Sequence, residues 1–204
     1  MSMVSSRTLG LMVIASVVYY VLAVLALHVV QPQVSPLKVP MSAYVLGSYG
    51  PVMTSTYFVL CVGLLGVGFG LIKGLPRAWL VKIAFAAALI ACAGVLVAGI
   101  FPLDWPPPPR TSSGRLHALG GMLAFYAMAL APGLFSLNFR SDGYWRRVSV
   151  VALALSAGII AMFILFVFAI RAGFGGVAQR LFLALLFSWM IVVGLHLSRS
   201  LRAT

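Results

Sequence analysis

Acidic side chains are almost absent from this sequence. Asp104 and Asp142 are the only carboxylates in 204 residues, and both lie between the long apolar runs rather than inside them. Proton- or ion-coupled transport normally depends on ionisable side chains within the membrane. Because the charged residues here lie near or beyond the ends of the runs, the sequence argues against a carboxylate-driven pump. It leaves the uncoupled movement of a lipid or small molecule open.

Cysteine is nearly absent as well. Cys61 and Cys92 fall near the middle of the second and third apolar runs. Oxidising enzymes do not act at that depth of a membrane, so we expect two buried thiols and no disulfide.

Apolar residues dominate what is present. They make up 63% of the chain, whose mean hydropathy is +1.13, too high for a soluble fold with a wetted exterior. Six continuous runs each approach the ~20 residues that a helix needs to cross the hydrocarbon core. The sequence therefore predicts one all-α domain over residues 1–204, a polytopic bundle of six transmembrane helices at approximately 8–30, 51–72, 79–101, 116–138, 149–170 and 177–198.

The net charge of +12 would suggest nucleic acid in a soluble protein, but here the cations lie between the runs and face lipid headgroups. They are unevenly divided, and the richer side is expected to be cytoplasmic. One side has nine (Arg7, Lys73, Arg77, Lys82, Arg140, Arg146, Arg147, Arg199, Arg202) and the other five (Lys38, Arg110, Arg115, Arg171, Arg180). We predict a plasma-membrane protein with both termini in the cytoplasm and no nucleic-acid partner.

Glycine pairs within the runs suggest close helix packing. Gly66 and Gly70 share a face of the second run, and Gly94 and Ala98 form a similar small face in the third. Small residues let membrane helices approach closely, so we expect the second and third helices to pack through these faces.

The richest polar cluster lies at the outer mouth of the third and fourth helices, between Asp104 and His117. Ser112 or Ser113 is a suitable N-cap for the fourth helix. The free N–H groups of that helix, with Arg115, would bind an anion such as a lipid phosphate. The alternative is an ordinary capped helix with Asp104 paired to an arginine.

Asp104 and His117 also suggest a catalytic possibility. They could form an acid/base pair, with a neighbouring serine as a nucleophile oriented by the histidine. The sequence thus predicts a membrane enzyme acting on lipid headgroups as a second class of function, although it does not decide whether the protein is an enzyme.

The last outer link adds Arg171, Gln179 and Arg180, so the outer face is electropositive and suited to anionic headgroups. Arginines that only extend from helix ends to the interface would look the same. His28 and His117 lie at matching outer depth and offer a further alternative, a haem or metal site. We expect no metal and no cofactor.

Four segments together resemble a known family: Pro40–Gly50, Gly99–Asp104, Ser113–His117 and Gly176–Arg180. Their most specific part is a Phe-Pro-x-Asp motif followed by Gly-x-x-His. The chain resembles, over nearly its whole length, the prokaryotic membrane family called domain of unknown function 998. The resemblance implies six membrane helices with recurring polar residues on the outer face, and no particular activity.

Our preferred function is that of a binding protein with an electropositive outer pocket formed by the three outer links. Its partners would be membrane lipids, through an anionic amphiphile or lipid headgroup, or another membrane subunit. The predicted ligand-binding residues are Tyr44, Arg110, Ser112, Ser113, Arg115, Gln179 and Arg180.

Overall fold

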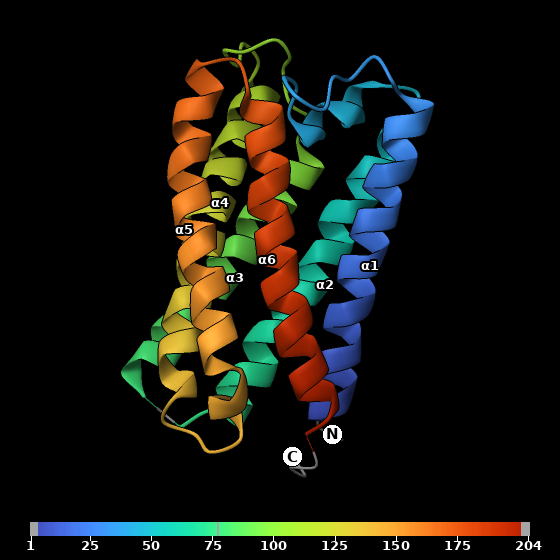
Figure 1. Cartoon of the computed structure of the whole chain (residues 1–204). Coiled ribbons are helices and arrows are strands. Elements are labelled where there is room, and N and C mark those ends of the chain that lie inside the picture. The colour runs from blue at the N-terminus through green and yellow to red at the C-terminus, as the bar shows by residue number, and fades with distance from the viewer. Residues whose placement is uncertain (1–3, 77, 201–204) are drawn as a thin grey trace.

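The computed structural model describes residues 4–76 and 78–200, and within these residues the chain is helical and has no strand. Figure 1 shows the long helices lying side by side. Two short 3-10 helices, η1 (Met41–Leu46) and η2 (Trp145–Val148), lie in connections. The six α-helices are α1 (Ser6–Val30), α2 (Gly50–Gly74), α3 (Trp79–Ile100), α4 (Ser112–Phe139), α5 (Ser149–Arg171) and α6 (Gly175–Ser198). Six segments are long and apolar enough to cross a membrane, which confirms the predicted fold class.

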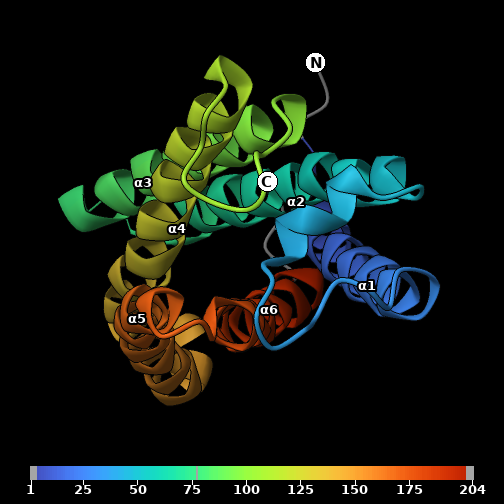
Figure 2. The same ribbon diagram turned by 90° about the horizontal axis from the view of Figure 1, so that it is seen from above.

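The helices form a closed ring. Each packs against the next along the chain, and α6 packs back against α1 (Figure 2). The chain enters α1 and leaves α6 at one end, which also holds the α2–α3 and α4–α5 connections and is called the terminal end here (Figure 1). The opposite end, called the loop end, holds the connections at 31–49, 101–111 and 172–174.

The start of α4 differs from the prediction. The helix begins at Ser112, one turn before the predicted residue 116, and its N-cap is Thr111 rather than Ser112 or Ser113. Thr111 Oγ1 accepts a hydrogen bond from the Gly114 N–H at 3.0 Å. Hydropathy does not detect this first turn, because its residues are polar or glycine although their backbone is helical.

Glycine brings α3 and α4 into backbone contact within the ring wall. A Cβ placed on Gly94 of α3 would lie 2.6 Å from the Gly120 carbonyl oxygen of α4. A Cβ on Gly120 would lie 2.8 Å from the Gly94 carbonyl oxygen. Because neither distance leaves room for a side chain, both positions require glycine at this spacing.

α2 and α3 pack against each other as predicted, but not through the small faces at Gly66, Gly70 and Gly94. Gly66 of α2 faces Val13 of α1, and Gly70 of α2 faces Leu197 of α6. Gly94 faces α4, as described above. Each small face does support close packing, but the partner helix follows from the ring order, which the sequence of a single helix does not contain.

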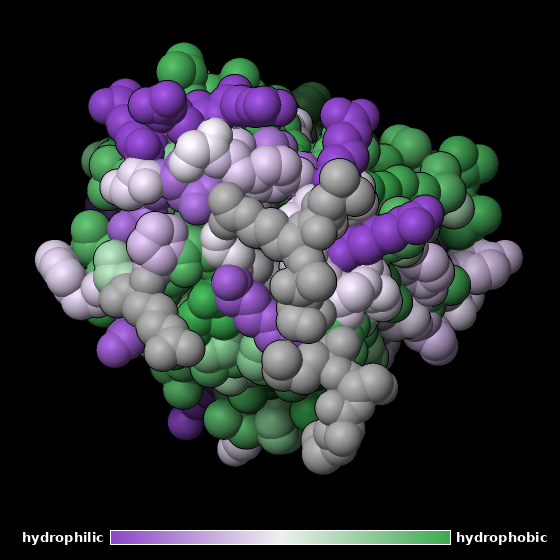
Figure 3. All heavy atoms as spheres, turned by 90° about the horizontal axis from the view of Figure 1, so that it is seen from below, coloured by the Kyte–Doolittle hydropathy of each residue, from purple (hydrophilic) through white to green (hydrophobic). Residues whose placement is uncertain are grey.

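The outer surface of the ring is apolar. Large exposed hydrophobic side chains lie along the helices, and α5 carries many of them, including Ile164, Leu165 and Phe168. At the terminal end, hydrophilic side chains spread over the face and hydrophobic ones flank it (Figure 3). Cys61 and Cys92 are both buried and free, as predicted, and the Cys61 thiol donates to the Cys92 carbonyl oxygen at 3.3 Å.

Candidate binding site inside the helix ring

A cavity lies inside the ring, in the half nearer the loop end. We call it the central pocket. Five of its lining side chains are polar: Tyr20, Ser42, Tyr57, His117 and Gln179. The others are Met53, Leu60, Val95, Ala98, Gly121, Ala124, Phe125, Met128 and Leu183. They come from η1 and from every α-helix except α5.

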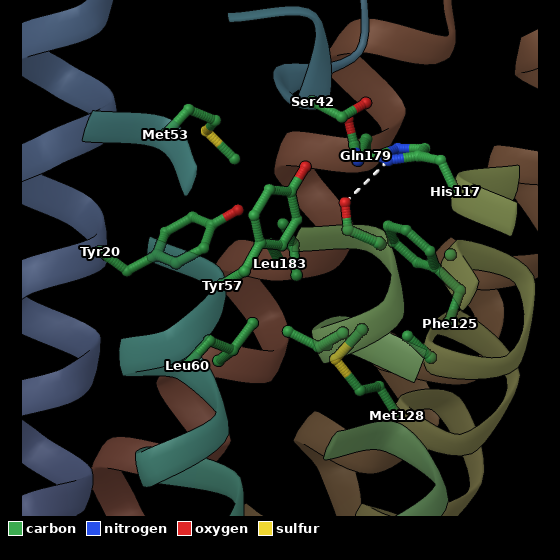
Figure 4. A pocket seen from close by; sticks show the side chains of 14 residues that line it. Tyr20, Ser42, Met53, Tyr57, Leu60, His117, Phe125, Met128, Gln179 and Leu183 are labelled. Atoms are coloured by element: carbon green, nitrogen blue, oxygen red, sulfur yellow. Dashed lines mark hydrogen bonds between the residues drawn. The ribbon is translucent and has the colours of Figure 1, made fainter. Parts of the chain in front are cut away.

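The size of the central pocket suits a small polar group. The centre of a water molecule can move through about 60 Å³ of it. The empty space between its atoms, opening included, is about 480 Å³. Ser42, His117 and Gln179 lie toward the loop end. Tyr20, Tyr57 and Phe125 lie at middle depth, and Leu60 and Met128 lie deeper (Figure 4).

Two tyrosines supply hydroxyl groups from neighbouring helices. Tyr20 of α1 is 4% exposed and Tyr57 of α2 is 8% exposed, and their hydroxyls point into the same space (Figure 4). Tyr57 Oη lies near the Ser42 side chain but has no hydrogen bond of acceptable geometry. A buried polar atom without a partner costs about 1–3 kcal/mol, so this hydroxyl is well placed for a ligand to bind.

Sequence reasoning missed both tyrosines. They occur within apolar runs and therefore resemble ordinary membrane aromatics. The available signal was their depth, because tyrosine in membrane proteins is enriched at the interface, where its hydroxyl is wet. A tyrosine well inside a span needs a polar partner there, and two of them on adjacent helices indicate a polar interior.

His117 of α4 faces the central pocket with a fixed tautomer. Its Nδ1 lies 2.9 Å from the Ala98 and Phe101 carbonyl oxygens at the end of α3. Carbonyl oxygens only accept, so Nδ1 carries the proton and donates it. The other ring nitrogen, Nε2, is therefore an acceptor in the neutral imidazole. Tyr57 packs against this ring, with a centroid separation of 6.4 Å.

Gln179 and η1 close the pocket toward the loop end. The Gln179 side chain is 8% exposed, and its Oε1 accepts a hydrogen bond from the Met41 N–H at 2.8 Å. The amide nitrogen at the other corner of the same group offers two N–H donors. Because Gln179 holds the first residue of η1, it also positions Ser42 at the pocket wall.

Arg180 fastens the 31–49 connection above the pocket. Its Nε donates to His28 Nε2 at 3.1 Å. Its Nη1 donates to three backbone carbonyl oxygens, those of Pro36, Val39 and Gly176, at 2.9, 3.1 and 3.0 Å. Its Nη2 is buried without a partner. The predicted ligand-binding arginine therefore holds the protein's own loop, and it does not line the central pocket.

His28 is fully engaged in the same cluster. Its Nδ1 lies 2.6 Å from the Val24 carbonyl oxygen, and its Nε2 accepts from Arg180. Neither nitrogen is left to bind iron or another metal, so the geometry does not favour a site shared by His28 and His117. Within residues 4–76 and 78–200, no group of three or more His, Cys, Asp and Glu side chains is arranged to hold a metal ion. Tyr44 is buried beside His28 with an unpartnered hydroxyl, and it does not line the central pocket.

Asp104 organises the start of α4. Its Oδ2 accepts the backbone N–H groups of Arg110 and Thr111, each at 2.6 Å, and its Oδ1 accepts the Thr111 hydroxyl at 2.9 Å. The Thr111 backbone N–H, followed by that of Arg110, holds the pKa of this carboxyl below its usual range. Asp104 and His117 thus have separate partners, and the structure shows no hydrogen bond between these two described residues.

The remaining predicted site residues surround this turn at the surface. Arg110, Ser112 and Arg115 are exposed, and Arg115 Nη2 donates to the Arg110 carbonyl oxygen at 3.5 Å. The Ser113 hydroxyl donates to the Pro102 carbonyl oxygen at 3.0 Å. None of these four residues lines the central pocket. Of the predicted site residues, the structure brings His117 and Gln179 together there.

The lining of the central pocket defines what it can bind. It contains no Asp, Glu, Lys or Arg side chain. It offers hydroxyls that donate or accept, amide N–H donors and one imidazole acceptor, above an apolar base. Such a lining fits an uncharged group with oxygen or nitrogen atoms joined to an apolar body.

The fold and its apolar surface define an integral membrane protein with six spanning helices. Residues 13–196 match the family described as "Protein of unknown function (DUF998)", and the chain belongs to this family. No curated protein and no solved structure gave a significant match.

Proposed function

We propose that this protein binds a membrane amphiphile in the central pocket. The uncharged polar head would lie among Tyr20, Ser42, Tyr57, His117 and Gln179, and the apolar part would lie against the deeper residues. The observation that carries the proposal is the buried Tyr57 hydroxyl, which points into the cavity without a hydrogen-bond partner. A ligand oxygen would supply that partner and remove the cost of leaving it unpaired.

The cations of the loop end act outside the pocket in this proposal. Arg110 and Arg115 are exposed and would attract anionic headgroups to the surface around α4. A charged head inside the pocket would lose its hydration and gain no ionic partner from the lining. An uncharged head suits the pocket better than the anionic head that the sequence suggested.

Orientation belongs to the same proposal. The terminal end carries more Lys and Arg than the loop end in the sequence count, so it would face the cytoplasm across the plasma membrane. The exposed Ser112 and Ser141 lie at opposite ends and allow a matched test. A membrane-impermeant maleimide added to intact cells should label Ser112→Cys and not Ser141→Cys. The reverse labelling would overturn the orientation.

Gly121 gives the direct test of binding. It lines the pocket from α4, between His117 and Phe125 on the same face, and a Cβ placed there meets nothing within 4 Å. A Gly121→Leu side chain would fill the cavity, while the loss of a helical glycine favours the fold by about 1 kcal/mol. Gly133→Leu is the control on the same helix, because its Cβ would face Ile160 of α5 instead.

The readout is native mass spectrometry of protein purified in mild detergent. We expect an uncharged lipid to co-purify with the wild type and with Gly133→Leu, and to be lost from Gly121→Leu. Retention of the same lipid by Gly121→Leu would refute the proposal. A protein subunit found in place of the lipid would instead support the partner-binding alternative.

A further inference from the structure

A second cavity lies below the central pocket, toward the terminal end. We call it the inner cavity. Its lining is entirely apolar at the cavity surface and includes Leu64, Ala88, Met128, Ala131, Phe135 and Trp189. The centre of a water molecule can move through about 20 Å³ of it. Apolar cavities of this kind stay dry and accept apolar groups.

The two cavities follow one another along the inside of the ring. Four helices line both cavities, and on each of them the lining continues about one turn closer to the terminal end. Leu60 of α2 is followed by Leu64, Val95 of α3 by Ala91, and Leu183 of α6 by Leu186. On α4 the two linings share Met128. Methionine is flexible and unbranched, so a change of rotamer at this one residue can widen the passage.

The inner cavity has a firm floor. Phe135 is 0% exposed and Trp189 is 2% exposed. The Trp189 indole Nε1 donates to the Ser136 hydroxyl at 2.9 Å, and Ser136 lies 3.2 Å from the Ser156 hydroxyl. These bonds hold the indole, which lines the inner cavity, in a fixed position and tie α6 to α4 and α5.

We propose that the inner cavity measures the length of a single apolar chain on the ligand of the central pocket. This proposal rests on the function proposed above. With its head among the polar residues, the ligand would pass its chain beyond Met128 and end against Phe135 and Trp189. His117 at the central pocket and Phe135 at the inner cavity are separated by ~27 Å along α4, at ~1.5 Å per residue. Chains that just reach Phe135 and Trp189 gain contacts there, and longer chains are blocked by these two side chains.

The test uses monoacylglycerols, whose head is an uncharged diol, in a saturated series from octanoyl to octadecanoyl. Apparent dissociation constants are measured by native mass spectrometry titration. Ala88→Leu and Ala131→Leu fill the inner cavity from two different helices, so one of them remains informative if the other fails to fold. Ala157→Leu, at an exposed position of α5, is the matched control. Dividing each variant's constant by that of the wild type cancels the partition of the probe into detergent.

We expect a ratio near one for octanoyl and about tenfold weaker binding for hexadecanoyl, because a filled cavity forces overpacking by the longer chain. The control should stay near one at every length. Equal loss at all lengths, or no loss at any, would overturn the length-measuring role. If Gly121→Leu still abolishes binding in that case, the central pocket remains the binding site and the inner cavity has no role in selecting chain length. If the wild type binds no member of the series and Gly121→Leu retains its co-purified lipid, both proposals fall.

Discussion

Gly120 and Gly121 are neighbours on α4 and serve opposite purposes. A Cβ on Gly120 would meet the Gly94 carbonyl oxygen of α3 at 2.8 Å, whereas a Cβ on Gly121 would meet nothing within 4 Å. Gly120 lies in the wall of the ring, and Gly121 lies at the central pocket. The wall at Gly120 is packed so closely that no side chain larger than hydrogen fits, whereas the space beside Gly121 is empty.

This difference argues that the empty space is not a consequence of loose packing. Protein interiors are close-packed, and an unfilled cavity costs free energy that a larger side chain at Gly121 would recover. The chain instead places polar groups around the space and leaves Tyr57 without a partner. A ligand gives both features one explanation.

The largest effect is expected from filling the wall. Gly120→Leu should push α3 from α4 and lower the free energy of unfolding by about 3 kcal/mol or more, because backbone atoms cannot yield to the new side chain. Gly121→Leu, the same change one residue away, should be as stable as the wild type or more so. Thermal unfolding followed by fluorescence-detected gel filtration measures both. Equal melting temperatures for the two variants would contradict the contrast between wall and interior.

The next effect concerns the connection over the pocket. Arg180→Lys keeps the charge but replaces a planar fork with a single ammonium group, which cannot reach His28 and three carbonyl oxygens together. We expect about 1–2 kcal/mol less stability. Faster proteolysis within residues 31–49 should accompany it. The exposed Arg171, also at the loop end, gives the control Arg171→Lys, which should change neither measurement.

The wall and the interior also differ in how far the sequence predicts them. The six spans follow from apolar runs, because length and hydropathy depend on the helix alone. The partner of each small face does not, since the order of the helices in the ring decides that Gly66 meets α1 and Gly70 meets α6. The glycines were correctly identified as packing residues, and the assignment of their partners failed.

The candidate site was predicted in part for a similar reason. His117 and Gln179 stood out because polar residues near helix ends are visible in a sequence. Tyr20 and Tyr57 were hidden among apolar residues, and their meeting depends on how α1 and α2 face each other. Asp104 and Arg110 were noticed for their charge. The hydrogen bond between them nevertheless belongs to a local turn, because Asp104 accepts from the backbone N–H of Arg110 rather than from its guanidinium.

A smaller and more selective effect is expected at Tyr57. Tyr57→Phe removes the unpartnered hydroxyl and keeps the ring, so the ligand-free protein should be equally or slightly more stable. Ligand binding should weaken by about tenfold, the value of one hydrogen bond in a buried site. The melting temperature measures the stability, and the apparent affinity for a monoacylglycerol measures ligand binding. A hydroxyl with only a structural role would give the opposite pattern, with lower stability and unchanged affinity.

The smallest effect is expected at the surface turn that holds α4, outside both wall and pocket. Asp104→Asn keeps the shape of the side chain and removes the charge that accepts the Arg110 and Thr111 N–H groups. Because folding lowers the pKa of this carboxyl, its contribution is present above the unfolded value of about 3.9 and is lost as the pH falls through the lower folded value.

The variant should therefore melt below the wild type at pH 7, and the two melting temperatures should converge as the pH falls below about 4. Ligand affinity at pH 7 should be unchanged in Asp104→Asn, because Asp104 does not line the central pocket. If Asp104→Asn instead had a lower ligand affinity and the melting temperature of the wild type, Asp104 would belong to the binding site. That result would favour the pairing with His117 that the sequence suggested.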